Sequence, residues 1–543
     1  MAEPTIQLGG GNWAGKSDNL LGYYKEGERF YKQDFTFSRS TTGTYTDSEG
    51  YIQEMPYNKL TYSNDFSNAA WVKDRCTLTS GQSGYDGSND AWLIQSTATS
   101  ASARCYQAFN SDGNFNRSVY AKKGTSDYLA IYTTNIAYAY FNLSNGTIGT
   151  ESNNVNASIL SVGNGWYRCS VTMSNVYDNH YIFVANVDNN TSTNSGDNIY
   201  IQDAQVNSGT SAKTYFPTTT RLNIPRVDYL NNSNGSLLLE PQRTNLITYS
   251  EDFTQWATNA TITPNSAISP DGTLNASLFS HSGGSFPQVT LSGITFVSGA
   301  DYIPSLYVKS DGTSQVQHSL LVNNIVINFT PTDEWVRISD LIVSPDTSGS
   351  FVIAQNSASS VAASFYIYGA QLEQGSYATT LINTSGSSVT RNQDVCSISN
   401  VADRIGQTEG TLYGEFDLKD NLTGTRRLLC LTDGTSTNRI TTYINGLDKL
   451  SVYIVDGGAA QADIQATILT EGTIKYALAY ANNSIKLYLN GTQVGTDTSA
   501  TIPSTSDFLV GFEYSGSSSY FNWRNCQLYS TALSDSELAT LTT

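Results

Sequence analysis

Charged residues, histidine, methionine and long apolar runs are all scarce in this chain of 543 residues. Only 14% of the residues are charged, and there are three histidines and three methionines. No run approaches the length of about 18 apolar residues that a spanning helix needs, so we expect no membrane insertion. The first eleven residues contain neither a basic segment nor an apolar stretch, so no secretory signal peptide is expected.

The scarcity of histidine weakens the case for an enzyme. His180, His281 and His318 are scattered without metal-binding or catalytic spacing, and we interpret each as a surface or loop residue. No Gly-x-Ser-x-Gly motif occurs between a strand and a helix, so a serine esterase is not supported. A carboxylate pair for glycoside cleavage cannot be recognised from sequence, although Glu415 and Glu513 are the places to look. We therefore expect no catalysis.

A phosphate-loop-like stretch, residues 9–16, is not preceded by a strand or followed by α/β alternation, so nucleotide binding is not expected. The six cysteines form no Cys-x-x-Cys pair, which excludes a zinc ribbon or a dithiol redox motif. They are typical of small core residues, although a Cys76–Cys105 disulfide remains open. Their positions are Cys76, Cys105, Cys169, Cys396, Cys430 and Cys526.

Basic residues are also in deficit. The chain has 29 Lys and Arg against 47 Asp and Glu, which gives a formal net charge of −18 with the histidines neutral. Such a surface repels phosphate backbones, so we expect no nucleic-acid partner. The simplest interpretation is that the charge keeps a large, tyrosine-rich protein in solution.

Aromatic and turn-forming residues are abundant, with 35 Tyr, 20 Phe and 43 Gly. Aromatic side chains suit the half-buried surface of a sheet, and Gly with Asn and Asp supplies the positive-φ positions of tight hairpins. The length exceeds what one hydrophobic core supports. The predicted fold class is therefore all-β, with tandem antiparallel jelly-roll sandwiches after a short N-terminal attachment segment.

A duplication organises the first two thirds of the chain. Four sequence blocks recur in the same order, which is hard to obtain by chance. The first copy has about 18 extra residues, which we place in a surface loop around residues 142–156. Trp166 and Trp335 are predicted to fill the cores. The paired blocks are 61–66 with Trp71 and 248–253 with Trp256, 118–122 and 305–309, 165–170 and 334–339, and 200–206 and 366–372.

The predicted organisation has five parts. These are a lead-in segment (1–57), a first sandwich (58–216), a linker (217–243), a second sandwich (244–390) and a C-terminal sandwich (391–543). Within the linker, residues 237–239 are predicted to form an edge strand. Residues 16–31 have helical spacing, and this segment is either an attachment element or packs on the first module.

The C-terminal region carries two local signals. Asn490-Gly491 after alternating residues predicts a type I′ hairpin. Ser534 and Glu537 form a capping-box pattern that predicts a short helix, with Leu538 and Leu541 packed on the sandwich.

Several of these segments resemble known proteins. Residues 35–45 and 47–52, the Tyr-Ser-Asn-Asp-Phe and Tyr-Ser-Glu-Asp-Phe blocks, and Leu239-Glu-Pro-Gln-Arg-Thr-Asn-Leu246 are similar to sequences of bacteriophage structural proteins. The stretch from 370–373 to 389–391 is similar to the closing edge of their carbohydrate-binding-like modules. Residues 487–491 and 528–535 resemble the concanavalin-like/laminin-G-like sandwich.

This resemblance implies a protein of the virion surface, made in the host cytoplasm. It implies a tail or head fibre or spike subunit, a homotrimer, that attaches to other virion proteins through its N-terminus and binds host cell-surface carbohydrate during adsorption. Two alternatives stay open. One is a head fibre or capsid decoration protein with a purely architectural role. The other is a glycan-cleaving tailspike, against which the sequence lacks a long β-helix repeat and an evident intramolecular chaperone.

The candidate carbohydrate-binding residues lie in two loops of the C-terminal region. The Gly/Ser-rich segment 514–523 carries Tyr514, Tyr520 and Trp523, which could stack on a sugar, while the alternative is that Trp523 caps the core. The hairpin 433–438 adds Asp433 and Asn438. Together with Asp456, these two residues are the candidate ligands for a calcium ion, the only cofactor considered.

Overall fold

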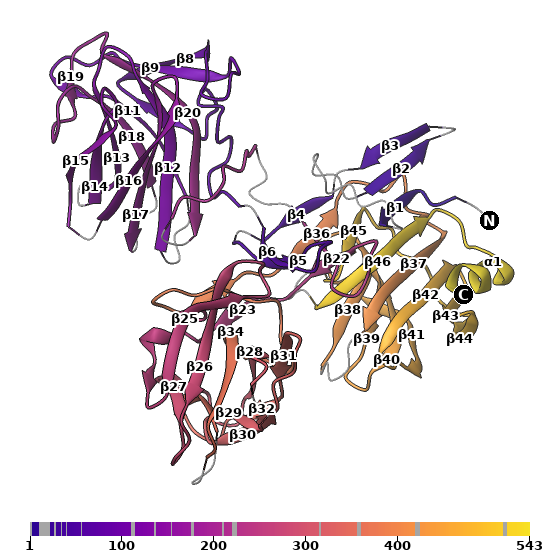
Figure 1. The fold of residues 1–543 in the computed structure, drawn as a ribbon. Helices are drawn as coiled ribbons and strands as arrows, with labels where there is room; N and C mark the ends of the chain where they lie inside the picture. Colours follow the sequence, from indigo (N-terminus) through magenta and orange to yellow (C-terminus); the bar gives the residue numbers. More distant parts are fainter. Residues whose placement is uncertain are drawn as a thin grey trace. The chain divides into compact units, whose positions relative to one another are not determined.

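The protein is all-β, as the sequence predicted, and its sheets are antiparallel (Figure 1). The computed structural model describes all residues except 1–2, 10–21, 27–28, 34, 40, 56, 110–113, 135–136, 154, 175–178, 209–210, 220–224, 314–315, 356–359, 419–423 and 514–518. The chain divides into two compact units, one of residues 40–42 and 56–224 and the other of 1–39, 43–55 and 225–543. No helix in the described ranges has the length and hydropathy needed to cross a bilayer.

The smaller unit is a sandwich of two six-stranded sheets, and we call it the first module. Its sheet orders are β15-β14-β13-β18-β11-β7 and β16-β17-β12-β20-β9-β8. Apolar residues that alternate along the strands fill the space between the sheets, including Leu129, Ile131 and Ile182. The strands are β7 (Val72–Asp74), β8 (Cys76–Gln82), β9 (Ala91–Ser96), β11 (Arg104–Ala108), β12 (Asn114–Lys123), β13 (Tyr128–Thr134), β14 (Ala137–Asn142), β15 (Thr147–Glu151), β16 (Val155–Gly163), β17 (Trp166–Ser174), β18 (Asn179–Ala185) and β20 (Asn198–Ser208), with the short pair β10 (Ala101–Ser102) and β19 (Ser192–Thr193).

The larger unit contains a second sandwich, which we call the second module. Its sheets are ordered β24-β27-β33-β29-β30 and β25-β26-β34-β28-β31. Its core contains Phe279, Leu320 and Phe365. The strands are β24 (Ala257–Thr258), β25 (Thr261–Ile268), β26 (Leu274–His281), β27 (Gln288–Thr295), β28 (Asp301–Ser310), β29 (His318–Val322), β30 (Ile325–Phe329), β31 (Val336–Ser339), β32 (Ile342–Val343), β33 (Ser348–Ala354) and β34 (Ala363–Gln374), with a 3₁₀ turn, η1 (Phe253–Gln255).

The duplicated blocks occupy equivalent positions in the two modules. Trp71 is buried, and its indole N–H donates to the carbonyl of Tyr62 at 2.9 Å. Trp256 does the same to the carbonyl of Tyr249 at 3.1 Å. The extra residues of the first copy form strands β15 and β16 instead of only a loop, and these pair with β14 in one sheet and with β17 in the other. They lengthen both sheets of the first module at one edge.

Trp166 and Trp335 do not fill the sandwich interiors. Trp166 is buried, but it packs in a small cluster with Tyr120 and Ala91 that is separate from the main core. Trp335 is only half-buried, and its indole donates to the carbonyl of Ile268 at 3.0 Å. The prediction is therefore wrong for Trp335, which precedes β31, whereas Trp166 is buried as predicted but in a satellite cluster outside the main core.

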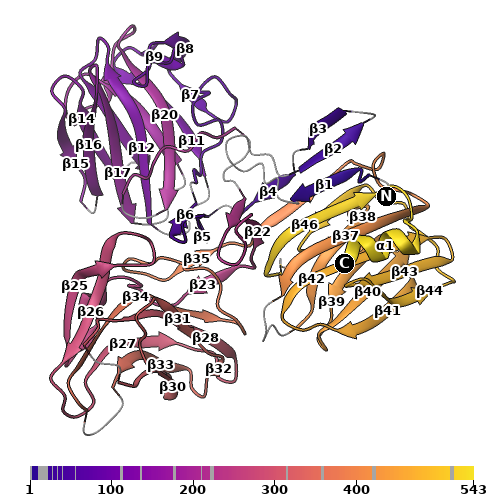
Figure 2. The ribbon, with the colours of Figure 1, turned by 45° about the vertical axis from the view of Figure 1, so that its right-hand side comes forward.

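The C-terminal sandwich packs a seven-stranded sheet against a ten-stranded one (Figure 2). The seven-stranded order is β4-β36-β45-β38-β39-β40-β41, and the main path of the other is β3-β2-β1-β46-β37-β42-β43-β44. The strands are β1 (Ile6–Gly9), β2 (Gly22–Glu26), β3 (Arg29–Gln33), β4 (Thr36–Ser38), β21 (Arg226–Asp228), β22 (Ser236–Leu239), β36 (Val395–Ile398), β37 (Glu409–Leu418), β38 (Arg426–Thr432), β39 (Arg439–Ile444), β40 (Lys449–Asp456), β41 (Ala459–Ile468), β42 (Gly472–Ala481), β43 (Ser484–Leu489), β44 (Thr492–Asp497), β45 (Asp507–Val510) and β46 (Phe521–Tyr529).

Two local predictions for this sandwich are confirmed. Asn490 and Gly491 both have positive φ, 45° and 83°, and they join β43 to β44 as a tight hairpin. Helix α1 (Asp535–Thr542) starts after Ser534, whose backbone N–H donates to Glu537 at 3.0 Å. Leu538 of this helix is fully buried against the sandwich, and Leu541 is partly buried in the same cluster.

The N-terminal segment differs from its prediction. Within residues 16–31 the described part forms strands β2 and β3 instead of a helix, and β1 pairs with β46 of the C-terminal sandwich. The helical spacing was overridden because β1, once paired with β46, offers a free strand edge to β2, and strand pairing depends on such tertiary context. The predicted strand of the linker is present as β22, which also pairs with β46 and is fully buried.

A buried ion network lies where the lead-in, the linker and the residues after the second module meet. Arg226 pairs with Glu240 at 2.7 Å and with Asp394, while Asp394 also pairs with Arg39 at 2.9 Å. Arg391 pairs with the same Glu240 at 2.7 Å, and all five side chains are at most 1% exposed. Burial opposes ionisation of Glu240, but Arg391 and Arg226 outweigh it and lower its pKa to about 2. These five residues, which we call the junction network, join segments that are far apart in sequence.

Two short strand pairs lie in the same unit, namely β5 (Thr44–Thr46) with β6 (Ile52–Glu54) and β23 (Arg243–Asn245) with β35 (Val389–Arg391).

Candidate functional site

The aromatic loop predicted to stack on sugars does not present its rings. Tyr514 lies outside the described residues. Tyr520 is only 4% exposed and packs edge-on against Tyr377, with ring centroids 5.4 Å apart. Trp523 is fully buried in the main core beside Phe416. The stacking role is therefore wrong for Tyr520 and Trp523, and the alternative, that Trp523 fills the core, is correct, because its position in β46 points between the sheets.

The second predicted loop is ordered by its own side chains. The amide of Asn438 donates to Asp433 at 2.7 Å, and the oxygen of the same amide accepts from the backbone of Gly457 at 2.9 Å. The other carboxylate oxygen of Asp433 accepts from the backbone N–H of Thr435 at 2.9 Å. These are the contacts of a turn.

The same residues do not form a calcium site. The carboxylate of Asp456 accepts instead from the hydroxyl of Thr501 at 2.7 Å. Calcium needs six or more converging oxygens, whereas the oxygens of Asp433 and Asn438 already accept protein hydrogen bonds. Across the part of the chain that the structure describes, no three His, Cys, Asp or Glu residues form a metal-binding group. The calcium ligand set therefore does not fit this geometry.

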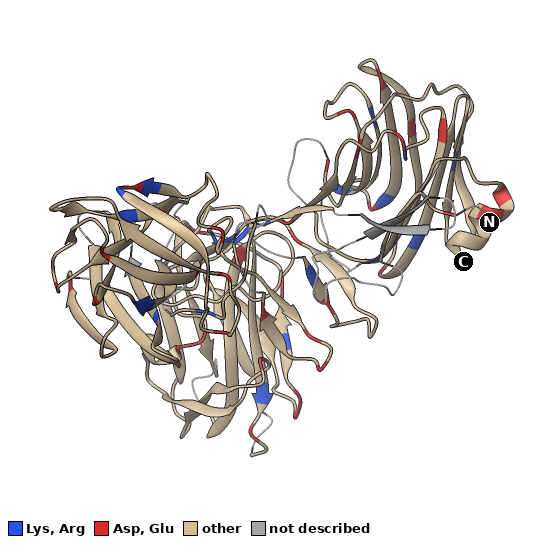
Figure 3. Cartoon of the chain, turned by 90° about the horizontal axis from the view of Figure 1, so that it is seen from above, with Lys and Arg blue, Asp and Glu red and all other residues tan. Residues whose placement is uncertain are grey.

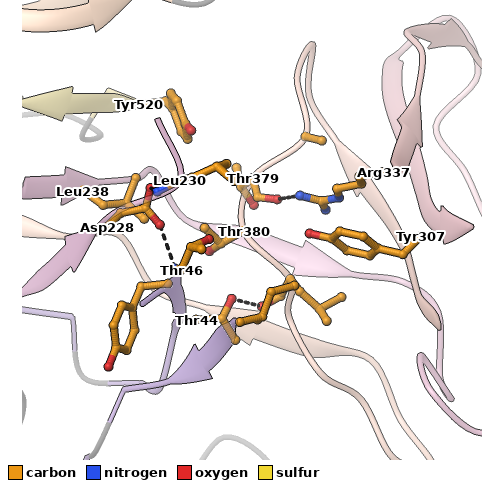
Figure 4. A pocket seen from close by; sticks show the side chains of 14 residues that line it. Thr44, Thr46, Asp228, Leu230, Leu238, Tyr307, Arg337, Thr379, Thr380 and Tyr520 are labelled. Carbon is orange, nitrogen blue, oxygen red and sulfur yellow. Dashed lines mark hydrogen bonds between the residues drawn. The ribbon is translucent and has the colours of Figure 1, made fainter. Parts of the chain in front are cut away.

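A cavity lies near the junction network, between the lead-in hairpin, the linker and the second module (Figure 4). Arg337 spans one side of it and donates to the carbonyl of Thr379 at 2.6 Å, while the backbone of Thr46 donates to Asp228 at 2.7 Å on the other. Its volume is about 50 Å³, which is room for one or two water molecules and not for a sugar. It therefore does not suit a glycan.

The strongest candidate for a binding surface is the outer side of the seven-stranded sheet. Strands β38, β39 and β40 lie next to one another, and their register places Arg427 opposite Tyr443 and Thr441 opposite Tyr453. Residues that alternate with them, such as Ile440 and Val452, point into the core. The side chains of Arg427, Arg439, Tyr443, Tyr453 and Glu513 form what we call the arginine–tyrosine face.

Ion pairs hold the arginines of this face in place. Glu513 forms ion pairs with both arginines, with one carboxylate oxygen 2.7 Å from Nε of Arg427 and the other 3.1 Å from Nε of Arg439, and it is only 7% exposed. The guanidinium of Arg427 lies 5.3 Å from the ring centre of Tyr443, and that of Arg439 lies 5.5 Å from the ring of Tyr453. Such contacts are typical of cation–π pairing. One carboxylate thus fixes two guanidinium groups against two partly exposed rings.

This arrangement suits binding more than proton transfer. A guanidinium offers several N–H donors to carboxylate or hydroxyl oxygens, and a tyrosine ring offers an apolar face with a polar edge. Beneath the face, burial raises the pKa of the Cys430 thiol to about 12, which makes it a poor nucleophile. Figure 3 shows that Lys, Arg, Asp and Glu are sparse along the strands, which consist mostly of other residues.

The two carboxylates considered for glycoside cleavage do not form a pair. Glu513 belongs to the outer side of the seven-stranded sheet, where it bridges two arginines. Glu415 lies on β37 of the ten-stranded sheet and accepts from the hydroxyl of Tyr413 at 3.1 Å, beside the cluster under helix α1. Packed sheets are about 10 Å apart, so two acids on opposite outer faces are beyond the separation that glycosidases use.

The histidines and cysteines also differ in part from expectation. His180 and His318 are buried within strands β18 and β29, so their interpretation as surface or loop residues is wrong. His281 is half-buried at the end of β26. All six cysteines are free, including Cys76 and Cys105, and all except Cys76 are buried, as expected for core residues.

The sequence analysis missed the arginine–tyrosine face. A signal was present, because Arg439-Ile-Thr-Thr-Tyr443 and Ser451-Val-Tyr453 place arginine and tyrosine on the outward positions of alternating strands. That signal did not say which strands would be neighbours, nor that Glu513 would reach them.

A comparison with protein families agrees with the architecture of the C-terminal sandwich. Residues 418–539 match the family model described as the concanavalin A-like lectin/glucanases superfamily. No curated protein sequence matches the chain.

Solved structures similar to part of the chain include three from bacteria. The CBM40 of the Ruminococcus gnavus IT-sialidase is 20% identical, over 25% of this chain and 84% of that chain, with a TM-score of 0.23. Domain 4 of AbnA, a GH43 extracellular arabinanase from Geobacillus stearothermophilus in complex with arabinotriose, is 14% identical over 28% of this chain and 73% of that one, with a TM-score of 0.23. The NanB sialidase of Streptococcus pneumoniae is 18% identical over 27% and 26% of the two chains, with a TM-score of 0.24.

Proposed function

We propose that the C-terminal sandwich, in which residues 418–539 match the concanavalin A-like lectin/glucanases superfamily, binds glycans through the arginine–tyrosine face without cleaving them. The observation that carries the proposal is Glu513, which holds Arg427 and Arg439 beside two tyrosine rings on an outer sheet surface. Fixed donors next to an aromatic face match the alternation of hydroxyl groups and apolar C–H surfaces on a sugar.

A paired substitution tests this site. In the full chain, Arg427→Ala with Arg439→Ala is expected to weaken binding to an array of bacterial surface polysaccharides by at least tenfold. Arg524 is the matched control, because it pairs with Asp417 on the other sheet at 2.8 Å. Arg524→Ala should leave binding unchanged, and equal binding by the double variant and the control would remove the proposal.

The absence of catalysis is part of the proposal. It is supported by the separation of Glu415 and Glu513 on opposite faces and by the burial of Glu513 between two arginines. Incubation of the purified protein with the polysaccharides that it binds should release no new reducing ends. Release of reducing ends that persists after Glu415→Gln and Glu513→Gln would point to a different catalytic pair, and loss of release would make these two acids catalytic.

We further propose that the chain is a virion surface protein of a bacteriophage, a fibre or spike subunit that assembles as a homotrimer. The support is the resemblance of residues 35–52 and 239–246 to phage structural proteins. Weak glycan sites repeated on a symmetric oligomer would give strong attachment to a host surface. Light scattering should give three times the 58.9 kDa chain mass, and particles labelled with antibody should carry the protein on their surface.

A second candidate role is architectural, as a head fibre or capsid decoration protein. The junction network favours it, because the phage-like segments contribute Arg39 and Glu240 to a buried network that ties the parts of the larger unit together. Electron microscopy of labelled particles distinguishes the roles, since label on the head together with no glycan binding would support architecture alone.

A further inference from the structure

Four tyrosines form a straight row across the first module. On the sheet β15-β14-β13-β18-β11-β7, the register pairs Tyr106 with Tyr181, Tyr181 with Tyr132 and Tyr132 with Tyr138. The row therefore crosses β11, β18, β13 and β14, which lie side by side in Figure 1. All four side chains are partly exposed. We call them the tyrosine strip.

The strip lies on the outer side of its sheet. Leu129 and Ile131, which alternate with the tyrosine positions of β13, belong to the main core. Tyr132, Tyr138 and Tyr181 instead pack on a separate cluster that contains Ala130 and Phe183. Neighbouring strands are about 4.8 Å apart, so four strands give a strip roughly 14 Å long. This is an extended aromatic surface and not a single exposed ring.

The rings of the strip support one another. The centroids of Tyr106 and Tyr181 are 4.5 Å apart, and Tyr132 and Tyr138 stack at 4.8 Å with an angle of 18° between their planes. At one end the guanidinium of Arg104 lies 5.1 Å from the ring of Tyr181. This arginine is held by Asp74 at 3.0 Å. The strip is therefore a built, largely neutral surface with a polar end.

The second module lacks these tyrosines although it has the same fold. The equivalent row across β27, β33, β29 and β30 pairs Thr290 with Val352, Val352 with Leu321 and Leu321 with Val326. Aliphatic and small side chains thus suffice to form this sheet. The tyrosines of the first module are not required by the shared architecture, which leaves a role at the surface.

We propose that the tyrosine strip is a second glycan-binding surface, on which an extended neutral oligosaccharide lies across the four strands. The aromatic faces match the apolar C–H faces of sugar rings, and the phenol hydroxyls can donate to or accept from sugar hydroxyls. The surface does not suit a nucleic acid, whose phosphates require clustered cations, because its one arginine is already paired with Asp74. The inference rests on the proposed glycan-binding role but not on the arginine–tyrosine face.

Four full-length proteins, with a fifth as control, test the proposal by native affinity electrophoresis in gels that contain dextran, mannan or a soluble β-glucan. They are the unchanged chain, Tyr132→Ala/Tyr138→Ala, Arg427→Ala/Arg439→Ala, and the combination of all four substitutions. The arginine variant should still be retarded by at least one polysaccharide, and the combined variant should be retarded at least tenfold less. Tyr132→Phe/Tyr138→Phe in the arginine background keeps the rings, so its binding should stay within threefold.

The outcomes separate the two sites. Equal retardation of the arginine variant and the combined variant would overturn the tyrosine strip while leaving the proposed function intact. Loss of all retardation in the arginine variant alone would also overturn it. If the unchanged chain were not retarded by any of the three polysaccharides, the strip as a neutral-glycan site would be rejected, and binding on the polysaccharide array would then decide the proposed function separately. Hydrogen exchange of strands β13 and β14 shows whether the alanine variant has kept its fold.

Discussion

Asn58 of the first module and Asn245 of the second make the same four hydrogen bonds. The amide of Asn58 donates to the carbonyls of Ala204 and Phe216, both at 3.1 Å, and that of Asn245 donates to the carbonyls of Ala370 and Ile382 at 3.2 and 2.9 Å. Each side-chain oxygen accepts from two backbone amides, at 3.1 and 3.0 Å in both modules. The two asparagines therefore close their modules in the same way.

Replacement of either asparagine should destabilise its own module. Asn58→Ala or Asn245→Ala leaves buried backbone groups without partners, at a cost of about 2–4 kcal/mol for the several groups concerned. Chemical denaturation followed by hydrogen exchange should place the loss in the module that carries the change. Asn234→Ala, at an exposed position, is the control and should change the free energy of unfolding by less than about 0.5 kcal/mol. If Asn58→Ala destabilised the protein no more than Asn234→Ala does, the hydrogen bonds of Asn58 would not be needed to close the first module.

Removal of one acid from the junction network should be costly. Asp394→Asn leaves Arg39 and Arg226 without a full counter-charge in a buried site, and loss of one partner of a buried pair costs about 3–5 kcal/mol. Strands β4, β21 and β36 should exchange amide hydrogens faster, while the first module should not change. If these three strands of the Asp394→Asn variant exchanged at the rates of the unchanged chain, the network would not be needed to hold the junction together.

Acid should weaken the network for a related reason. The folded-state pKa of Glu240 is about 2, below its ordinary value of 4.5, so its contribution is complete above pH 4.5 and is lost as the pH falls toward 2. When the free energy of unfolding is measured as a function of pH, the Glu240→Gln variant should therefore be destabilised most near neutral pH and least near pH 2, relative to the unchanged chain. A difference that is constant over this range would contradict the assignment.

The second module should also lose stability between pH 6.5 and 4. Burial lowers the pKa of His318 from 6.5 to about 4, with His281 nearby adding to the effect. The unfolded chain then binds a proton that the folded chain does not, which removes about 3 kcal/mol over this window, and stability is flat above pH 6.5. His318→Phe, in a site lined by Phe329 and Phe365, should flatten this dependence. An unchanged slope in that variant would assign the effect to other groups.

Truncation of Trp523 should mainly lower stability, whereas truncation of Tyr453 should mainly weaken polysaccharide binding. Trp523→Ala empties a fully buried site and should cost about 3–5 kcal/mol. Tyr453→Ala, on the arginine–tyrosine face, should cost much less stability but weaken polysaccharide binding at least fivefold, because the ring that supports Arg439 is lost. Unfolding curves and array binding measured on the same preparations check both, and a binding loss confined to Trp523→Ala would favour the aromatic loop after all.

Calcium should have little effect on the C-terminal sandwich. The oxygens of Asp433 and Asn438 accept protein hydrogen bonds, and Asp456 faces Thr501, so a bound ion would have to break these contacts. A millimolar calcium addition, or its removal with a chelator, should shift the melting temperature by less than about 1 °C, since a ligand stabilises only in proportion to its binding to the folded state. A larger, saturable shift that Asp433→Asn abolishes would restore the calcium site.

Much of the architecture could be predicted because it depends on local patterns. Two-residue alternation identified strands such as β40 and β43, Asn490-Gly491 identified a hairpin, and Ser534 with Glu537 identified a helix start. The duplication was visible because both copies keep the residues that close the fold. The helix expected within residues 16–31 is not formed, because spacing alone cannot detect that β1 would offer a free strand edge to these residues.

The sequence by itself determined that this protein is a string of antiparallel sandwiches with an internal repeat, since the period of a strand and the chemistry of a turn are properties of neighbouring residues. Only the tertiary structure decided which polar and aromatic side chains meet. Glu513 reaches Arg427 across strands that are distant in the chain, and four tyrosines from four strands form one row. The reason is that strand order and register arise from the packing of whole sheets, which no local pattern contains.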